Sequence, residues 1–146
     1  GVTVVTFTAE DVEEIYQFSG ELDCVALRYS HENNNPELLK ELKAICLDAE
    51  KCLAKRNFDK WKQYSDQFHL AFFKYADNRW LERAANKMRA QLTLLSNLYQ
   101  YNGNVEKIHQ DHQGICDLLE KGEVEGAIEA MRQHYQRDLA YALAAI

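Results

Sequence analysis

Three histidines occupy positions on helical stripes where an apolar side chain is expected. His69 lies among phenylalanines, His112 lies in a stripe of isoleucines and a leucine, and His134 follows a methionine by three positions. Each falls on a different predicted helix, so three helices aim one imidazole each at the interior. Neutral imidazole is a common ligand of zinc, nickel and other first-row metals. The pattern indicates a three-histidine metal site or, alternatively, three histidines that are satisfied within the core.

Smaller polar residues share these predicted apolar faces. Ser65 and Asp66 precede His69 by four and three positions and can reach its helix face, and Ser19 interrupts the stripe of the first predicted helix. They could line a cavity, or the serines could bond to a backbone carbonyl one turn earlier. The sequence contains no nucleophile elbow, phosphate-binding glycine loop or zinc-finger spacing. We therefore do not expect an enzyme, and a metal-dependent hydrolase is the weakest alternative.

The elements that must position these residues are helices. From Thr8 onward apolar residues recur at helical spacing, and Pro36 is the only proline in 146 residues. Short connections between amphipathic helices make neighbours antiparallel. The sequence predicts an all-α fold, an antiparallel helical bundle of about six helices, at residues 9–29, 36–52, 58–75, 79–101, 105–120 and 123–146.

Local signals predict where the helices begin and end, and which faces are buried. Thr8 is expected to cap the first helix, Gly122 to end the fifth, and residues 31–35 to form a loop before the second. The inward face of the first helix is expected to comprise Ile15, Phe18, Leu22, Val25, Ala26 and Tyr29.

Composition indicates which partners the protein can bind and where in the cell it is expected. The net charge of −6 argues against direct contact with DNA, whose phosphates demand a basic surface. No apolar run reaches the roughly 18 residues that a membrane span needs, and residues 1–7 lack the basic region of a signal peptide. The four cysteines form no C-x-x-C pair and are expected to be reduced small hydrophobes. We therefore expect no membrane association and a cytoplasmic location.

Three segments, in this order and spacing, resemble a known domain. The first is EDVEEIY at 10–16, and the second is FH at 68–69 followed by ADN at 76–78. The third is DHQGI at 111–115, followed by GE at 122–123, Ala127, AM at 130–131 and His134. From about Thr8 to its end the chain resembles the FCD domain, the effector-binding half of FadR-type regulators within the GntR family. The resemblance implies a homodimer that binds a small carboxylate effector inside the bundle.

The resemblance also implies a divalent metal, zinc or nickel, held by one aspartate and three histidines. His69, His112 and His134 match the histidines, but the aspartate position is Ser65, with Asp66 one residue out of register. We therefore expect weaker metal binding than in relatives that carry the aspartate.

A second departure concerns the effector. An arginine that often faces the effector from the first helix of the family is Ser19 here, and Arg89 on the fourth predicted helix is another candidate for that role.

The resemblance suggests a division of the chain. Residues 1–7 are similar to the end of a wing strand and the linker that follow a winged-helix DNA-binding domain, which is absent, and residues 8–146 form the effector-binding and dimerisation domain. Operator DNA would be contacted only through that absent N-terminal domain. The alternative is a structural dimerisation module without a ligand, which Ser19 and Ser65 would favour.

Overall fold

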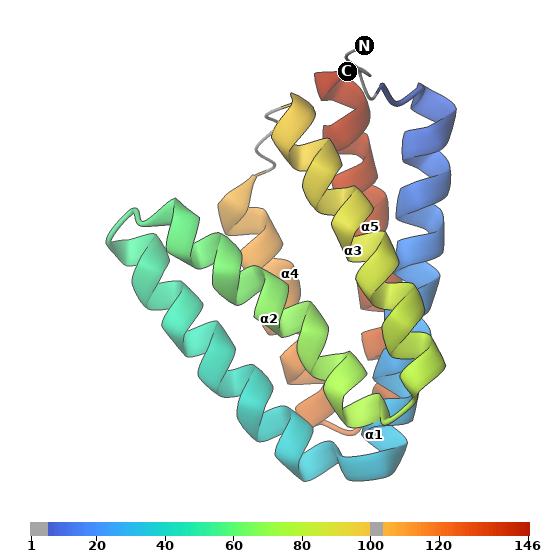
Figure 1. Ribbon diagram of the computed structural model, residues 1–146. Helices are drawn as coiled ribbons and strands as arrows, with labels where there is room; N and C mark the ends of the chain where they lie inside the picture. Colours follow the sequence, from blue (N-terminus) through green and yellow to red (C-terminus); the bar gives the residue numbers. More distant parts are fainter. Residues whose placement is uncertain (1–5, 100–103) are drawn as a thin grey trace.

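The chain folds into five helices, which a computed structural model describes over residues 6–99 and 104–146. The helices are α1 (Ala9–Ala54), α2 (Phe58–Ala76), α3 (Arg79–Tyr99), α4 (Val105–Glu120) and α5 (Val124–Ala145). Consecutive helices run in opposite directions, and α1 bends back on itself (Figure 1). No strand occurs in these two ranges, which confirms the predicted all-α bundle. The predicted strand end falls largely on residues 1–5, outside the described part of the chain.

The count of five arises because the first two predicted helices are joined in α1. The sequence predicted a loop at residues 31–35, but the structure has a kink, with non-helical backbone angles at Asn34 (φ −160°, ψ 69°). Pro36 interrupts the helical hydrogen bonding, because proline lacks the backbone N–H that would donate to the carbonyl one turn earlier. The Asn33 side-chain amide donates to the carbonyls of Tyr75 and Ala76, at 3.1 and 2.9 Å, and so attaches the corner to the end of α2.

The predictions for Thr8 and Gly122 agree with the structure. The Thr8 hydroxyl accepts from the Asp11 N–H and the Asp11 carboxylate accepts from the Thr8 N–H, forming a capping box. Gly122 follows α4 with a φ of +77°, a conformation that favours glycine. These local signals fix the start of α1 and the end of α4, the helix that carries His112.

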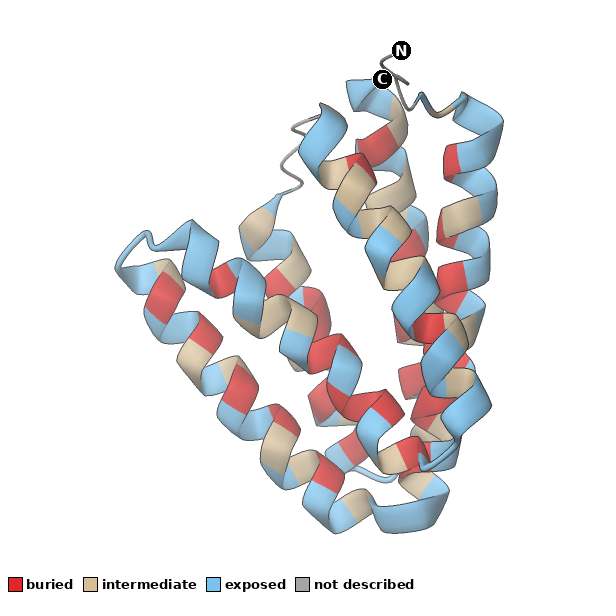
Figure 2. Cartoon of the chain, in the orientation of Figure 1, coloured by how far each residue is buried: buried red, intermediate tan, exposed pale blue. Residues whose placement is uncertain are grey.

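In the first half of α1, burial departs from the predicted inward face. Residues facing the space between the helices are buried (Figure 2), and the second half of α1 buries a regular apolar stripe of Leu38, Leu42, Ile45, Ala49 and Cys52. In the first half the prediction is wrong for Phe18, Val25 and Tyr29, which are 50%, 38% and 39% exposed.

The buried face of that half is instead partly polar, comprising Val12, Tyr16, Ser19, Gly20, Asp23, Cys24, Ala26, Leu27 and Ser30. Polar residues can face inward here because Asp23 finds hydrogen-bond partners on α2 and α5. Gly20 allows close packing, since an added Cβ would lie 3.1 Å from Cβ of Tyr135 on α5. No helix of the described chain is both long and apolar enough to cross a membrane.

Candidate metal centre and adjoining cavity

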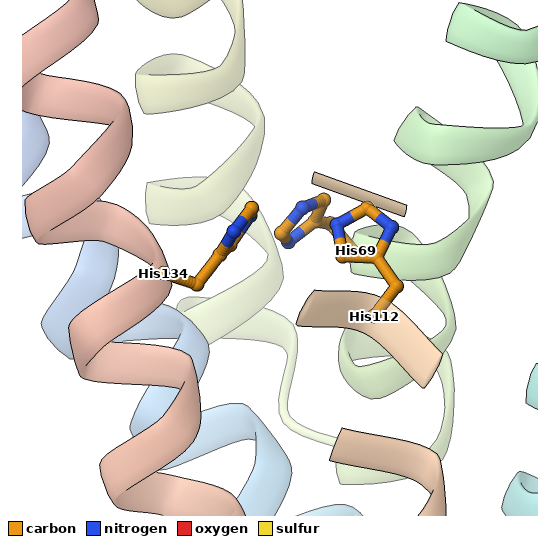
Figure 3. Close-up of side chains that lie close together, drawn as sticks. All are labelled: His69, His112 and His134. Carbon is orange, nitrogen blue, oxygen red and sulfur yellow. The ribbon is translucent and has the colours of Figure 1, made fainter. Parts of the chain in front are cut away.

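The three histidines predicted from the sequence converge. His69 on α2, His112 on α4 and His134 on α5 are 4%, 3% and 1% exposed. Each offers a ring nitrogen, and these nitrogens lie within 4.8 Å of one another. Figure 3 shows the three side chains extending from their helices toward a shared space. Burial on three helices therefore produces one cluster of nitrogen ligands.

Asp23 orients the first of these imidazoles. Nδ1 of His69 lies 2.6 Å from Oδ2 of Asp23, and the Tyr135 hydroxyl donates to the same oxygen at 2.7 Å. Burial, followed by the positive charge of Arg89, holds the pKa of His69 well below its ordinary value. The ring is therefore neutral, its Nδ1–H donates to Asp23, and the lone pair of Nε2 remains free. Burial also raises the pKa of Asp23 to about 6, against the opposing effects of Arg89 and Tyr135.

Asp111 supports a second imidazole from the other side of the cluster. Nδ1 of His134 lies 3.1 Å from Oδ2 of Asp111. Arg137 donates to both oxygens of this carboxylate, to Oδ2 at 3.1 Å and to Oδ1 at 2.8 Å. Burial opposes ionisation of Asp111, but the hydrogen bonds from His134 and Arg137 lower its pKa overall. Because Nδ1 of His134 donates to this carboxylate, Nε2 is left as the nitrogen available to a metal.

His112 has a different environment. Its ring stacks on Phe68, with centroids 4.1 Å apart, and burial followed by the neighbouring histidines lowers its pKa well below the ordinary value. Nε2 of His112 is buried and has no hydrogen-bond partner among the described residues. A buried polar atom without a partner is costly, so this nitrogen is suited to a bound ligand.

These residues fit a divalent transition-metal ion. Three neutral imidazoles form a donor set suited to zinc or nickel. Two of the imidazoles donate their other N–H to a carboxylate, an arrangement that fixes the tautomer of a metal-bound histidine and raises its basicity. The sequence analysis assigned no role to Asp23 or Asp111. Asp111 adjoins His112 in the chain, whereas nothing in the sequence links Asp23 to a histidine 46 residues away.

Asp138 is a further acidic residue beside the cluster that the sequence analysis did not assign. Its Oδ2 lies 3.5 Å from Nε2 of His134, one helical turn away on α5. Its Oδ1 is buried and has no hydrogen-bond partner within the described ranges. Burial raises the pKa of Asp138, partly offset by the nearby His134. The signal that could have identified it is the i, i+4 spacing from His134.

A cavity of about 670 Å³ opens beside the cluster, with His69, His134 and Asp138 on its wall. Its size suits a small metabolite. Apolar and aromatic side chains form much of the wall, including Tyr16, Phe58, Trp61, Leu92, Val105, Ile108 and Tyr141.

Three other residues singled out in the sequence lie on this wall, and one does not. Ser65, Asp66 and Arg89 all line the cavity, and Arg89 donates to Asp66 at 2.6 Å. Asp66 is thus paired with an arginine rather than placed in the histidine cluster. Ser19 is buried one turn from Asp23 on α1 and is not among the described residues that line the cavity. Its hydroxyl has no hydrogen-bond partner in the described part of the chain.

Comparison with known proteins adds two findings. The family model of the FCD domain matches residues 14–137. In structure, the chain is similar to the metal-free FCD domain of TM0439, a candidate transcriptional regulator, with 18% sequence identity, a TM-score of 0.78 and 97% of each chain covered. This likeness concerns the fold. No protein of curated function matches the chain in sequence.

Proposed function

This chain belongs to the FCD domain family, and on that premise we propose that it is the ligand-sensing domain of a transcription regulator. The observation that carries the proposal is the convergence of the three histidines beside a cavity of about 670 Å³, with His69 and His134 on its wall. A small molecule in that cavity would contact α2, α3 and α5 together. It can shift the conformation of the domain by as much as its affinity differs between two states.

The metal part of the proposal assigns His69, His112 and His134 as ligands of a zinc or nickel ion. Asp23 and Asp111 hold two of the rings in the tautomer that leaves Nε2 available. When bound, the ion supplies a positive centre that attracts an anionic ligand.

The effector part assigns a small organic carboxylate to the cavity. Arg89 is a cation of the cavity wall whose charge acts on both His69 and Asp23. Its hydrogen bonds to Asp66 and Tyr135 use only some of the five donors that a guanidinium carries. The remaining donors can bind a carboxylate, a function that the family more often places at the position of Ser19. Ser65 and Asp66 would border this site.

The partner part assigns a second copy of the chain. The apolar residues Phe18, Val25 and Tyr29 lie at helical spacing and are exposed on the outer side of α1, which supports an interface there. DNA binding would belong to a separate winged-helix domain, since the present chain carries a net charge of −6. The alternative of a ligand-free dimerisation module is disfavoured by the cavity and by the unpartnered Nε2 of His112.

Metal titration tests the first part of this proposal. Purified protein is stripped with a chelator and titrated with zinc and with nickel in a calorimeter, beside a variant in which His69, His112 and His134 are replaced by alanine. We expect one ion per chain in the native protein and none in the variant. His31→Ala, at the kink of α1 and outside the cluster, is the control. Equal binding by the triple variant would refute the assignment.

Ligand screening tests the second part. The metal-loaded protein is heated with mono-, di- and tricarboxylates, and a rise in melting temperature identifies binders. Arg89→Ala should abolish the rise, whereas Arg83→Ala on the same helix should keep it, because Arg83 lies against Trp80 instead of the cavity. A carboxylate that stabilises both variants equally would exclude Arg89 as its partner.

A further inference from the structure

Ser65 stands where the resemblance to the FCD family implies an aspartate ligand, so the three histidines alone give the proposed centre no negative charge. Three neutral imidazoles around a divalent ion keep its full charge of about +2, and the cavity next to it contains several acidic residues. Among them, Asp66 forms an ion pair with Arg89. Asp138 is the one acid for which a contact with the histidine cluster is seen in the described part of the cavity wall.

The separation between Asp138 and His134 decides between two roles. Nε2 of His134 and Oδ2 of Asp138 are 3.5 Å apart, which is longer than the 2.7–3.2 Å of an ordinary N–H···O hydrogen bond. Imidazole nitrogens and carboxylate oxygens lie about 2.0–2.2 Å from a zinc ion, so two such ligands at a tetrahedral angle are roughly 3.4 Å apart. The distance thus suits two ligands of one ion better than a hydrogen-bonded pair.

Burial supports the same role. Oδ1 of Asp138 is buried without a hydrogen-bond partner in the described chain, as is Nε2 of His112 across the cluster. A carboxylate oxygen and a neutral imidazole nitrogen are both atom types that a divalent metal ion binds, and each is left here without a hydrogen-bond partner among the described residues. Asp138 also follows His134 by one helical turn, so the two side chains share a face of α5.

We infer that Asp138 is the carboxylate ligand of this centre, supplied by α5 in place of the acidic residue that Ser65 replaces on α2. The inference rests on the proposed metal function. The centre then has three histidines and one aspartate, with the acidic ligand contributed by a different helix. Its net charge falls to about +1, so an anionic effector is bound more through the cavity wall and less through the metal.

Calorimetric titration of the stripped protein with zinc tests this assignment. We expect Asp138→Asn to weaken zinc binding by about tenfold or more, because it removes a charged ligand. Asp59→Asn is the matched control, since Asp59 is an exposed acid that lines the same cavity and lies outside the histidine cluster. Cobalt provides a second readout, because loss of a carboxylate ligand changes its visible absorption spectrum. Circular dichroism melts establish that both variants are folded.

A double substitution sharpens the test. Ser65→Asp should restore about tenfold of zinc affinity in the Asp138→Asn chain but add less than about threefold in the native chain, because one acidic ligand suffices. Equal losses from Asp138→Asn and Asp59→Asn, or an unchanged cobalt spectrum, would overturn the assignment while leaving the three-histidine site intact. Absence of zinc binding in the native protein would instead refute the metal function on which the inference depends.

Discussion

The two carboxylates that orient the histidines contrast in their surroundings. Asp23 is enclosed between α1, α2 and α5, with side-chain exposure of 3%, and its partners His69 and Tyr135 are equally buried. Asp111 also has little exposure, at 5%, but Arg137 and Lys107 link it to the surface, with side chains 37% and 45% exposed. The same pairing of histidine and carboxylate is therefore built once in the core and once at its edge.

The contrast indicates different roles for the two pairs in stability. If Asp23 is lost, two buried donors remain without an acceptor and water cannot easily replace it. If Asp111 is lost, its arginine and lysine partners can return to solvent. Both pairs fix a tautomer, so their effects on metal binding should be alike while their effects on folding differ.

The largest effect is expected for Asp23→Ala. It leaves the Nδ1–H of His69 and the hydroxyl of Tyr135 buried without a partner, so the free energy of unfolding should fall by about 3 kcal/mol. Urea denaturation followed by circular dichroism measures the change. Glu13→Ala, at an exposed position of the same helix, should be neutral. A loss below about 1 kcal/mol would show that water or another acceptor replaces the carboxylate.

Asp111→Ala should destabilise less while weakening the metal site comparably. We expect a loss of roughly 1–2 kcal/mol in unfolding free energy, because its cationic partners can be solvated again. Zinc affinity should fall roughly 10- to 100-fold, as for other carboxylates that support a metal-bound histidine. Calorimetric titration and urea denaturation of the same sample give both quantities. A folding cost equal to that of Asp23→Ala would remove the distinction between core and edge.

Tyr135→Phe isolates one hydrogen bond of the buried pair. The substitution keeps the ring packed against Gly20 and removes the donor to Asp23. The loss should be about 1 kcal/mol, with His69 still bonded to the carboxylate. Tyr29→Phe at the exposed stripe of α1 is the control and should have no measurable effect. If Tyr135→Phe also leaves the free energy of unfolding unchanged, the hydrogen bond from the Tyr135 hydroxyl to Asp23 does not contribute to stability.

The smallest change is expected for Ser65→Asp in the native chain. An added carboxylate on the cavity wall should raise zinc affinity slightly and weaken binding of an anionic ligand by repulsion, by a few-fold. Titration of the zinc-loaded protein with succinate, a simple dicarboxylate, tests the second effect. Ser65→Asn is the uncharged control. Tighter succinate binding to Ser65→Asp would place the anion away from Ser65.

The sequence by itself determined the helices, most of their ends and the three histidines. Helical periodicity, a capping box at Thr8 and a glycine at position 122 act within a few residues, so they can be recognised without the fold. The histidines were recognisable for the same reason, because each interrupts an apolar stripe on its own helix. The break at Pro36 was also local, although its form, a kink within one helix rather than a loop, depended on contacts with the end of α2.

The tertiary structure decided which face of α1 is buried and which acidic residues serve the histidines. In the first half of α1 an apolar stripe and a partly polar stripe lie on adjacent faces, and periodicity favoured the apolar one. The polar face is buried because Asp23 meets partners 46 and 112 residues away in the chain. The free energy of burying a carboxylate depends on such partners, and only the packing of α2 and α5 against α1 brings them together.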